Sequence, residues 1–226
     1  MHIWAIGDLH LSFNEKGKIT KPMEKFGANW QEHEQKIWDN WQQKVQAEDW
    51  VLLAGDVSWA MKPNEAVYDL LWLKNLPGKK VLVKGNHDFW WQGIGKTEKL
   101  LEPMLPLYNN ALPMGNFALC GGRGYQTTPQ WSDEKLKMRE YARLKSSLAQ
   151  GKAMEKDIII LLHYPPYDYD GKDNIFSELL MQYNPKAVIY GHLHNKETDI
   201  YRTSLGKIKM YPVSCDYLNF NLQLIF

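Results

Sequence analysis

The stretch Val81-Leu82-Val83-Lys84-Gly85-Asn86-His87-Asp88 decides how the chain folds and where its chemistry lies. The apolar residues at its start predict a buried β-strand. An amide oxygen, an imidazole and a carboxylate then follow in three consecutive positions. Because functional residues usually lie beyond the carboxyl ends of parallel strands, we expect this turn to form one wall of a functional site.

Four other apolar runs end in the same way. Asp8 and His10 follow residues 3–7, Asp56 follows residues 51–54, His163 follows residues 157–162, and both His192 and His194 follow residues 187–190. In extended chain every second side chain points to the same side, so Asp8 and His10 are expected to face the same point. Five of the seven histidines lie at these strand ends, which makes a chance arrangement improbable.

The segments between these strands predict an α/β fold. Helices are expected within residues 20–49, from Pro63 to about Pro77, over 96–105, from Ser132 to about Gln150 and over 175–183. A further strand is expected over 116–120. Residues 201–226 are expected to form hairpin strands that complete a second sheet. The run from strand 51–54 through its helix to strand 80–84 predicts a right-handed βαβ unit with parallel strands. A chain of 226 residues is expected to form one domain, residues 1–226.

Composition narrows the class of protein. The formal net charge is +1, so the sequence carries no strong signal for nucleic-acid binding. No apolar run approaches the length of a membrane span and no leader pattern is visible, which predicts a cytoplasmic protein. The two cysteines, Cys120 and Cys215, are expected to be reduced thiols. His33 is expected to be solvated or to cap its helix, because no second ligand type lies at helical spacing from it.

The residue types at the strand ends favour metal binding. Nitrogen and oxygen ligands without a thiolate suit manganese, iron or zinc. Seven such side chains are too many for one ion but fit two divalent ions if one carboxylate bridges them. A two-metal site lowers the pKa of a shared water so that hydroxide is available near neutral pH, and it stabilises the charge of a phosphoryl group during in-line displacement.

The set of motifs resembles the calcineurin-like metallophosphoesterases. Asp8-Leu9-His10, Gly55-Asp56, Gly85-Asn86-His87-Asp88, the lone His163 and Gly191-His192-Leu193-His194 occur in that family's order. The resemblance implies a four-layer α-β-β-α sandwich with two central mixed sheets. It further implies that one metal is held by Asp8, His10 and His194, that Asp56 bridges, and that the second metal is held by Asn86, His163 and His192. By the same resemblance, His87 protonates the leaving oxygen or stabilises the phosphoryl charge.

One departure from the family bears on function. Protein Ser/Thr phosphatases of this superfamily follow Gly-Asp with a further Asp and an Arg, whereas Val57-Ser58-Trp59-Ala60 follows Asp56 here. A protein phosphatase is therefore disfavoured. The group that orients His87 is left open, with Asp88 as the nearest candidate in the sequence and hence a candidate catalytic residue.

The expected function is hydrolysis of a small phosphoester or nucleotide. Arg123 is a candidate phosphate-binding residue, and Trp90 and Tyr125, together with Trp59 and Trp91, are candidates for an aromatic substrate pocket. Three alternatives stay open: a nuclease, a hydrolase of a lipid-linked nucleotide diphosphate, and an interaction scaffold that keeps the fold without turnover. The sequence does not distinguish monoesterase from diesterase activity, and it does not indicate an oligomeric state.

Overall fold

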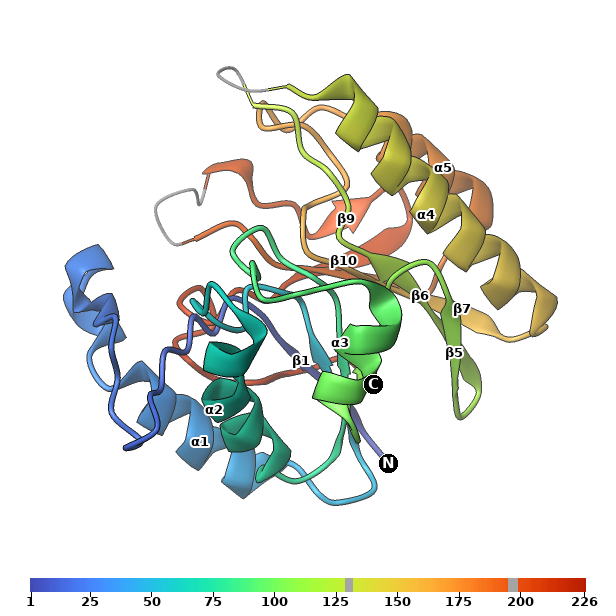
Figure 1. The fold of residues 1–226 in the computed structure, drawn as a ribbon. Helices are drawn as coiled ribbons and strands as arrows, with labels where there is room; N and C mark the ends of the chain where they lie inside the picture. The colour runs from blue at the N-terminus through green and yellow to red at the C-terminus, as the bar shows by residue number, and fades with distance from the viewer. Residues whose placement is uncertain (129–131, 195–198) are drawn as a thin grey trace.

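The computed structural model describes residues 1–128, 132–194 and 199–226, and two mixed β-sheets form its centre (Figure 1). The first sheet has the strand order β11 (Gln223–Leu224), β1 (Ile3–Ile6), β2 (Trp50–Leu53), β3 (Lys79–Leu82) and β4 (Leu105–Pro106). The second has the order β5 (Ala111–Met114), β6 (Phe117–Gly122), β7 (Asp157–Leu162), β8 (Ala187–Tyr190), β10 (Ile208–Pro212) and β9 (Ser204–Leu205). Strands β2 and β3 are parallel across helix α2, as the βαβ prediction requires.

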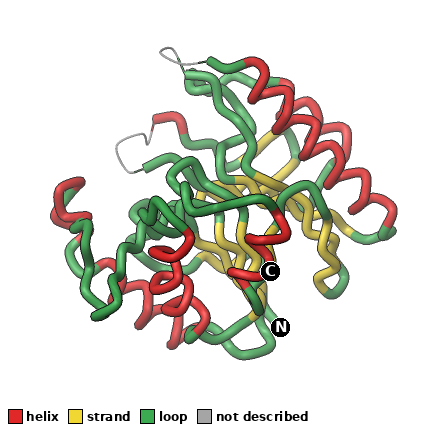
Figure 2. Tube along the Cα trace, viewed as in Figure 1, coloured by secondary structure: helices red, strands yellow, loops and turns green. Residues whose placement is uncertain are grey.

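Helices cover the outer face of each sheet (Figures 1 and 2). The first sheet is covered by α1 (His33–Lys44), α2 (Pro63–Lys74) and α3 (Ile94–Leu101), and the second by α4 (Glu134–Ala153) and α5 (Ile175–Tyr183). Two short 3-10 turns, η1 (Met23–Phe26) and η2 (Ala28–Trp30), precede α1. The arrangement is the predicted α-β-β-α sandwich. Among the described helices none is both long enough and apolar enough to cross a membrane.

Alternation along the strands explains the layers. In β7, Ile158 and Ile160 pack under the helices of the second sheet, whereas Ile159 and Leu161 pack between the two sheets. In the first sheet, Leu52 joins that central layer while its neighbours in β2 face the helices. Successive side chains of a strand point to opposite faces, so strands that are apolar at every position supply two cores at once.

The carboxyl ends of the parallel strands meet at one edge of the sandwich. Strands β1, β2 and β3 are parallel to one another, and so are β6, β7, β8 and β10. The two sheets are joined at this edge where Gly7, directly after β1, forms a parallel bridge with Ser214, the second residue after β10. Segments that are far apart in the sequence therefore lie side by side beyond these strand ends.

The structure corrects two sequence predictions. The segment 201–226 does not lie in one sheet, because β11 pairs with the free edge of β1 in the first sheet and only β9 and β10 join the second. His33 is not solvated: it is buried, and its Nε2 lies 3.0 Å from the carbonyl oxygen of Leu9. Helical spacing identified the buried face of α1 but not the polar atom that this face meets in the loop after β1.

Candidate metal centre

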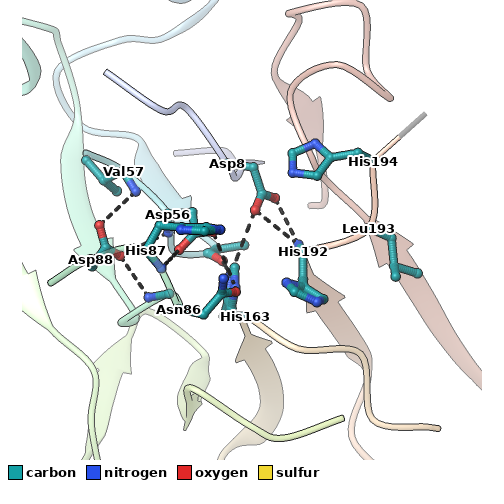
Figure 3. A network of polar contacts seen from close by, with 12 residues as sticks. Asp8, Asp56, Val57, Asn86, His87, Asp88, His163, His192, Leu193 and His194 are labelled. Carbon is teal, nitrogen blue, oxygen red and sulfur yellow. Dashed lines mark hydrogen bonds and ion pairs between the residues drawn. The ribbon is translucent and has the colours of Figure 1, made fainter. Parts of the chain in front are cut away.

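The predicted ligands converge from five strand ends (Figure 3). Asp8, His10 and His194 offer ligand atoms that all lie within 4.8 Å of one another, and so do Asp8, Asp56 and His163. Asn86 is part of the same cluster, because its Oδ1 lies 2.6 Å from His163 Nε2. The two groups share Asp8, so their ligand atoms form one connected cluster.

Glycines allow the loops to approach one another at the centre. A Cβ on Gly85 would lie 1.9 Å from Asp56 Oδ1, and a Cβ on Gly191 would lie 2.6 Å from Asp8 Oδ2. Contacts below 3 Å are sterically excluded, so any other residue at either position would displace a carboxylate. Because Gly85 and Gly191 have no side chain, the carboxylates of Asp56 and Asp8 can occupy the space beside them.

Four of the predicted ligands have a left-handed backbone. The φ angles are 57° at Asp8, 48° at His10, 49° at Asp56 and 72° at His192. This region is uncommon for residues other than glycine, although aspartate and histidine tolerate it better than most, and such strained positions gather at functional sites. The turns direct these side chains inward instead of continuing the strands.

Hydrogen bonds orient two of the imidazoles. His163 Nδ1 lies 2.8 Å from the carbonyl oxygen of Ala54, which selects the tautomer that donates there and leaves the Nε2 lone pair facing the cluster. His194 Nδ1 lies 3.0 Å from Asp216 Oδ1, and this carboxylate likewise orients an imidazole that belongs to the cluster with Asp8 and His10. A carboxylate or carbonyl behind a histidine is the usual support of a metal-binding imidazole.

Burial keeps the imidazoles neutral and penalises the carboxylates. It lowers the pKa of His163 to about 3 and holds the pKa of His10 and of His192 well below the usual value. It also raises the pKa of Asp8, where Asp56 adds to the effect, and that of Asp56. Buried carboxylates are costly without a compensating cation, and neutral imidazoles are the form that binds metals.

The residues fit divalent metal ions on this evidence. His10 supplies a further observation, because its Nδ1 is buried and has no hydrogen-bond partner within the described part of the chain. A buried ring nitrogen without a partner is expensive unless a ligand meets the imidazole. The donor set of carboxylate, amide and imidazole groups suits manganese, iron or zinc, and the structure does not distinguish among them.

Comparison with known proteins identifies the family. Residues 1–196 match the model of the calcineurin-like phosphoesterases. The chain belongs to this family. It is accordingly a metal-dependent phosphoester hydrolase, and the motif resemblance seen in the sequence is confirmed. A curated relative, the Gene 66 protein of Mycobacterium phage D29, is 34% identical over 88 residues, which are 38% of this chain and 40% of the phage protein.

Solved structures share the calcineurin-like fold at low sequence identity. The protein TT1561 of Thermus thermophilus aligns with a TM-score of 0.62 at 14% identity, over 99% of this chain and 97% of that one. A phosphopantetheinyl hydrolase from Mycobacterium tuberculosis aligns with a TM-score of 0.59 at 15% identity, over 100% and 95% of the two chains. A protein of unknown function from Aquifex aeolicus, AQ665, aligns with a TM-score of 0.54 at 16% identity, over 99% and 95%. At these identities the likeness concerns the fold alone.

Aromatic rings hold His87 in this phosphoesterase. Its ring centroid lies 4.5 Å from that of Trp59, 5.7 Å from His10 and 6.2 Å from Phe89. The backbone N–H of His87 donates to Asp56 Oδ1 at 2.7 Å. Partial burial lowers the pKa of His87, and the charge of Asp56 opposes this effect. The imidazole is therefore positioned by ring packing.

The prediction that Asp88 orients His87 is wrong. Asp88 is buried, and its two oxygens accept hydrogen bonds from five N–H groups: those of Asp56, Val57, Ser58 and Gly85, and Nε1 of Trp90. Burial and the nearby Asp56 raise the pKa of Asp88 to about 7 against these hydrogen bonds. Asp88 thus joins the two loops that carry Asp56 and Asn86 (Figure 3).

Two residues predicted to line a substrate pocket are buried instead. Trp90 is fully buried and donates its Nε1 hydrogen to Asp88 at 3.0 Å. Tyr125 is 1% exposed, and its hydroxyl accepts a hydrogen bond from the backbone of Asp133 at the start of α4. Trp91 is also buried. Aromatic residues next to a strand end are equally suited to closing the end of a core, and only Trp59 of this group is half-buried beside the predicted ligands.

Arg123 lies close to the other side of the centre. Its guanidinium is 5.5 Å from the ring centroid of Tyr164, which in turn lies 4.3 Å from the ring of His192 and 5.0 Å from that of His163. The positive charge of Arg123 contributes to lowering the pKa of Asp56, of His163 and of His192. Its Nε is buried without a partner among the described residues.

Sequence reasoning missed two side chains at the site. Asp216, which supports His194, follows the strand β10 through Val213-Ser214-Cys215, a strand-end position like those of the predicted ligands. Tyr164, beside His163, follows the clearest buried strand of the chain. The strand-end signal was therefore present for both. The thiol of Cys215 donates to the carbonyl oxygen of Asp8, and both cysteines are free and buried, as expected.

Proposed function

We propose that the chain hydrolyses a small phosphoester or nucleotide at a centre of two divalent metal ions. Asp8, His10 and His194 would hold one ion, Asn86, His163 and His192 the other, and Asp56 would bridge them. The observation that carries this proposal is the convergence of the ligand atoms of Asp8, His10 and His194 and of Asp8, Asp56 and His163. The bridging role of Asp56 is the one that the family resemblance implies. The ions supply an activated water and charge neutralisation for the phosphoryl group.

His87 is assigned to the leaving group. Its half-buried ring stands beside Asp56 and beside the rings that bound the centre, so it is able to give a proton to the oxygen that departs. Burial lowers the pKa of His87, so its imidazole is protonated only at a lower pH than an ordinary histidine, and the protonated ring is the stronger proton donor. Arg123 is assigned to the phosphoryl oxygens. Its Nε is buried without a partner among the described residues, and its positive charge contributes to lowering the pKa of Asp56.

The test is hydrolysis of 4-nitrophenyl phosphate and of bis(4-nitrophenyl) phosphate by protein loaded with manganese. We expect turnover of at least one ester, loss of about 10²-fold or more in His87→Ala, and loss of bound manganese in His10→Ala or Asp56→Asn. His2→Ala, an exposed histidine outside the centre, is the matched control. Unchanged activity in His87→Ala would remove its assigned role, and unchanged metal content in both ligand variants would refute the metal centre.

The same protein separates the alternatives. Cleavage of DNA that falls steeply with added salt would favour a nuclease. Hydrolysis confined to a lipid-linked nucleotide diphosphate would favour that class. Protein that binds no added metal, measured by plasma mass spectrometry, would favour a scaffold.

A further inference from the structure

A cavity of ≈ 490 Å³ adjoins the side of the centre that holds His87. Residues 12–16, 20–21 and 59–61 form its walls together with Glu65, Tyr68 and Asp69 of α2. The cavity shares Trp59 with the centre, since this ring also stacks on His10 with the centroids 4.6 Å apart and lies against His87. Pockets of this size are typical of sites for small organic molecules.

The walls of the cavity are apolar in large part. Phe13, Trp59, Met61 and Tyr68 line it, and Met61 and Tyr68 are 56% and 36% exposed although they are large and apolar. Exposed apolar side chains gathered around a concavity are a feature of ligand-binding sites. The body of a ligand that fits here is therefore apolar or aromatic.

Two of the carboxylates in the walls, those of Glu65 and Asp69, already have partners. Glu65 accepts hydrogen bonds from the backbone of Met61 and Lys62, and Asp69 accepts one from the backbone of Phe13 and one from the hydroxyl of Ser58. These groups serve the local fold, so they are poorly placed to bind a ligand cation.

Lys21 contributes a cation to the cavity beside Trp59, the ring that the cavity shares with the centre. Its ammonium lies 4.6 Å from the ring centroid of Trp59, so it is no more than about 9 Å from the ring of His87. In the described part of the chain no carboxylate forms an ion pair with it. The other charges in the walls, Glu15 and Lys16, are exposed neighbours of opposite sign in one turn.

We propose that this cavity binds the leaving group of the substrate, and that the leaving group combines an apolar body with an anionic group recognised by Lys21. The inference rests on the proposed function, because His87 marks the leaving-group side only if it protonates the departing oxygen. The substrate class is then a phosphate ester whose alcohol carries a carboxylate or a further phosphate. Water adds its oxygen to phosphorus, the bond from phosphorus to the ester oxygen breaks, and that oxygen takes a proton.

The experiment compares two esters of the same shape, 4-carboxyphenyl phosphate and 4-carbamoylphenyl phosphate, with manganese present and phosphate release as the readout. We expect kcat/KM of the wild type to favour the carboxylate over its neutral amide by about fivefold, as for a partly exposed ion pair. The preference should vanish in Lys21→Met, persist in Lys21→Arg and be unchanged in Lys25→Met, an exposed lysine outside the cavity. Replacing the carboxylate by a phosphonomethyl group tests a phosphate-like anion in the same place.

The ratio of kcat/KM for the two esters shows which of the two proposals has failed. Hydrolysis of both esters by the wild type without a preference, or a preference that survives Lys21→Met, would overturn this inference and leave the proposed function standing. Hydrolysis of neither ester by manganese-loaded protein would overturn this inference, and the proposed function would fall with it if neither 4-nitrophenyl phosphate nor bis(4-nitrophenyl) phosphate is hydrolysed. Since each variant is compared with itself on two substrates, partial unfolding lowers both rates and does not change the ratio.

Discussion

Replacing Asp88 by asparagine tests the idea that one buried carboxylate joins the two metal-binding loops. The substitution keeps size and shape but exchanges one oxygen for an amide that donates hydrogen bonds. Oδ1 accepts from Val57, Ser58 and Trp90, whereas Oδ2 accepts from the backbone N–H groups of Asp56 at 2.9 Å and Gly85 at 2.8 Å. If the asparagine oxygen takes the place of Oδ1, its NH₂ group takes the place of Oδ2. The buried backbone N–H groups of Asp56 and Gly85 would then face a donor instead of an acceptor.

The expected loss of stability follows from those two N–H groups. Each buried donor left without an acceptor costs about 1–3 kcal/mol, so Asp88→Asn should lower the free energy of unfolding by about 2–6 kcal/mol. That is a large part of the stability of an ordinary domain. Manganese affinity should also fall by about 10- to 100-fold, because Asp56 and Asn86 lie on the loops that Asp88 holds together.

The assays are urea unfolding, followed by far-UV circular dichroism, and manganese titration. The unfolding midpoint should fall while its slope stays the same. Asp170→Asn, at an exposed loop aspartate, is the control and should change stability by less than about 0.5 kcal/mol. If Asp88→Asn unfolds within 1 kcal/mol of the wild type and binds manganese equally well, the two loops hold their places without this carboxylate, and the reasoning is refuted.

Three further predictions concern groups around the centre. Asp216→Ala should weaken manganese binding by about 10- to 100-fold in a titration, because His194 loses its hydrogen-bond partner; equal affinity would contradict this. Gly85→Ala should cost about 3 kcal/mol or more in urea unfolding and abolish manganese binding, since the added methyl overlaps the Asp56 carboxylate, and a stable, metal-binding variant would disprove the close approach. Burial raises the pKa of Asp69 from 3.8 to about 6, so the native state binds its proton more tightly than the unfolded chain and stability is lost as pH rises between these values. The stability of Asp69→Asn relative to the wild type should therefore rise by up to about 3 kcal/mol from pH 4 to pH 7, and a difference independent of pH would refute the assigned cause.

The strand ends show what local sequence can predict. Asp8, Asp56 and His163 each follow an uninterrupted apolar run, and such a run has few options besides a buried parallel strand. Since the carboxyl ends of parallel strands lie at one edge of a sheet, the convergence of these residues was predictable without knowing any distance. The glycines before Asn86 and His192 are also informative in the sequence. A residue without Cβ next to a polar ligand allows another part of the chain or an ion to come close to the backbone.

Hydrogen-bond and packing partners that are distant in the sequence were not predictable. Asp88 lies next to His87 in the sequence, yet it turns to the backbone of residues 56–58, about 30 positions earlier in the chain. Trp90, Tyr125 and Trp59 are all aromatic residues that follow a predicted strand, so the sequence does not separate them. The packing of neighbouring loops decides that Trp90 and Tyr125 are enclosed and that Trp59 borders a cavity.

The amino-acid sequence by itself determined the α/β class and the set of candidate ligands, because the apolar runs and the residues that follow them are short-range features. The order of the motifs pointed to the family, and the layered fold was expected through that resemblance. Only the tertiary structure decided what supports those ligands and what borders the leaving-group side. Asp216 behind His194, the five donors around Asp88 and the ammonium of Lys21 over Trp59 all join segments that are distant in the chain. Hydrogen bonds and packing depend on separations of a few ångströms in space, and spacing along the sequence does not contain them.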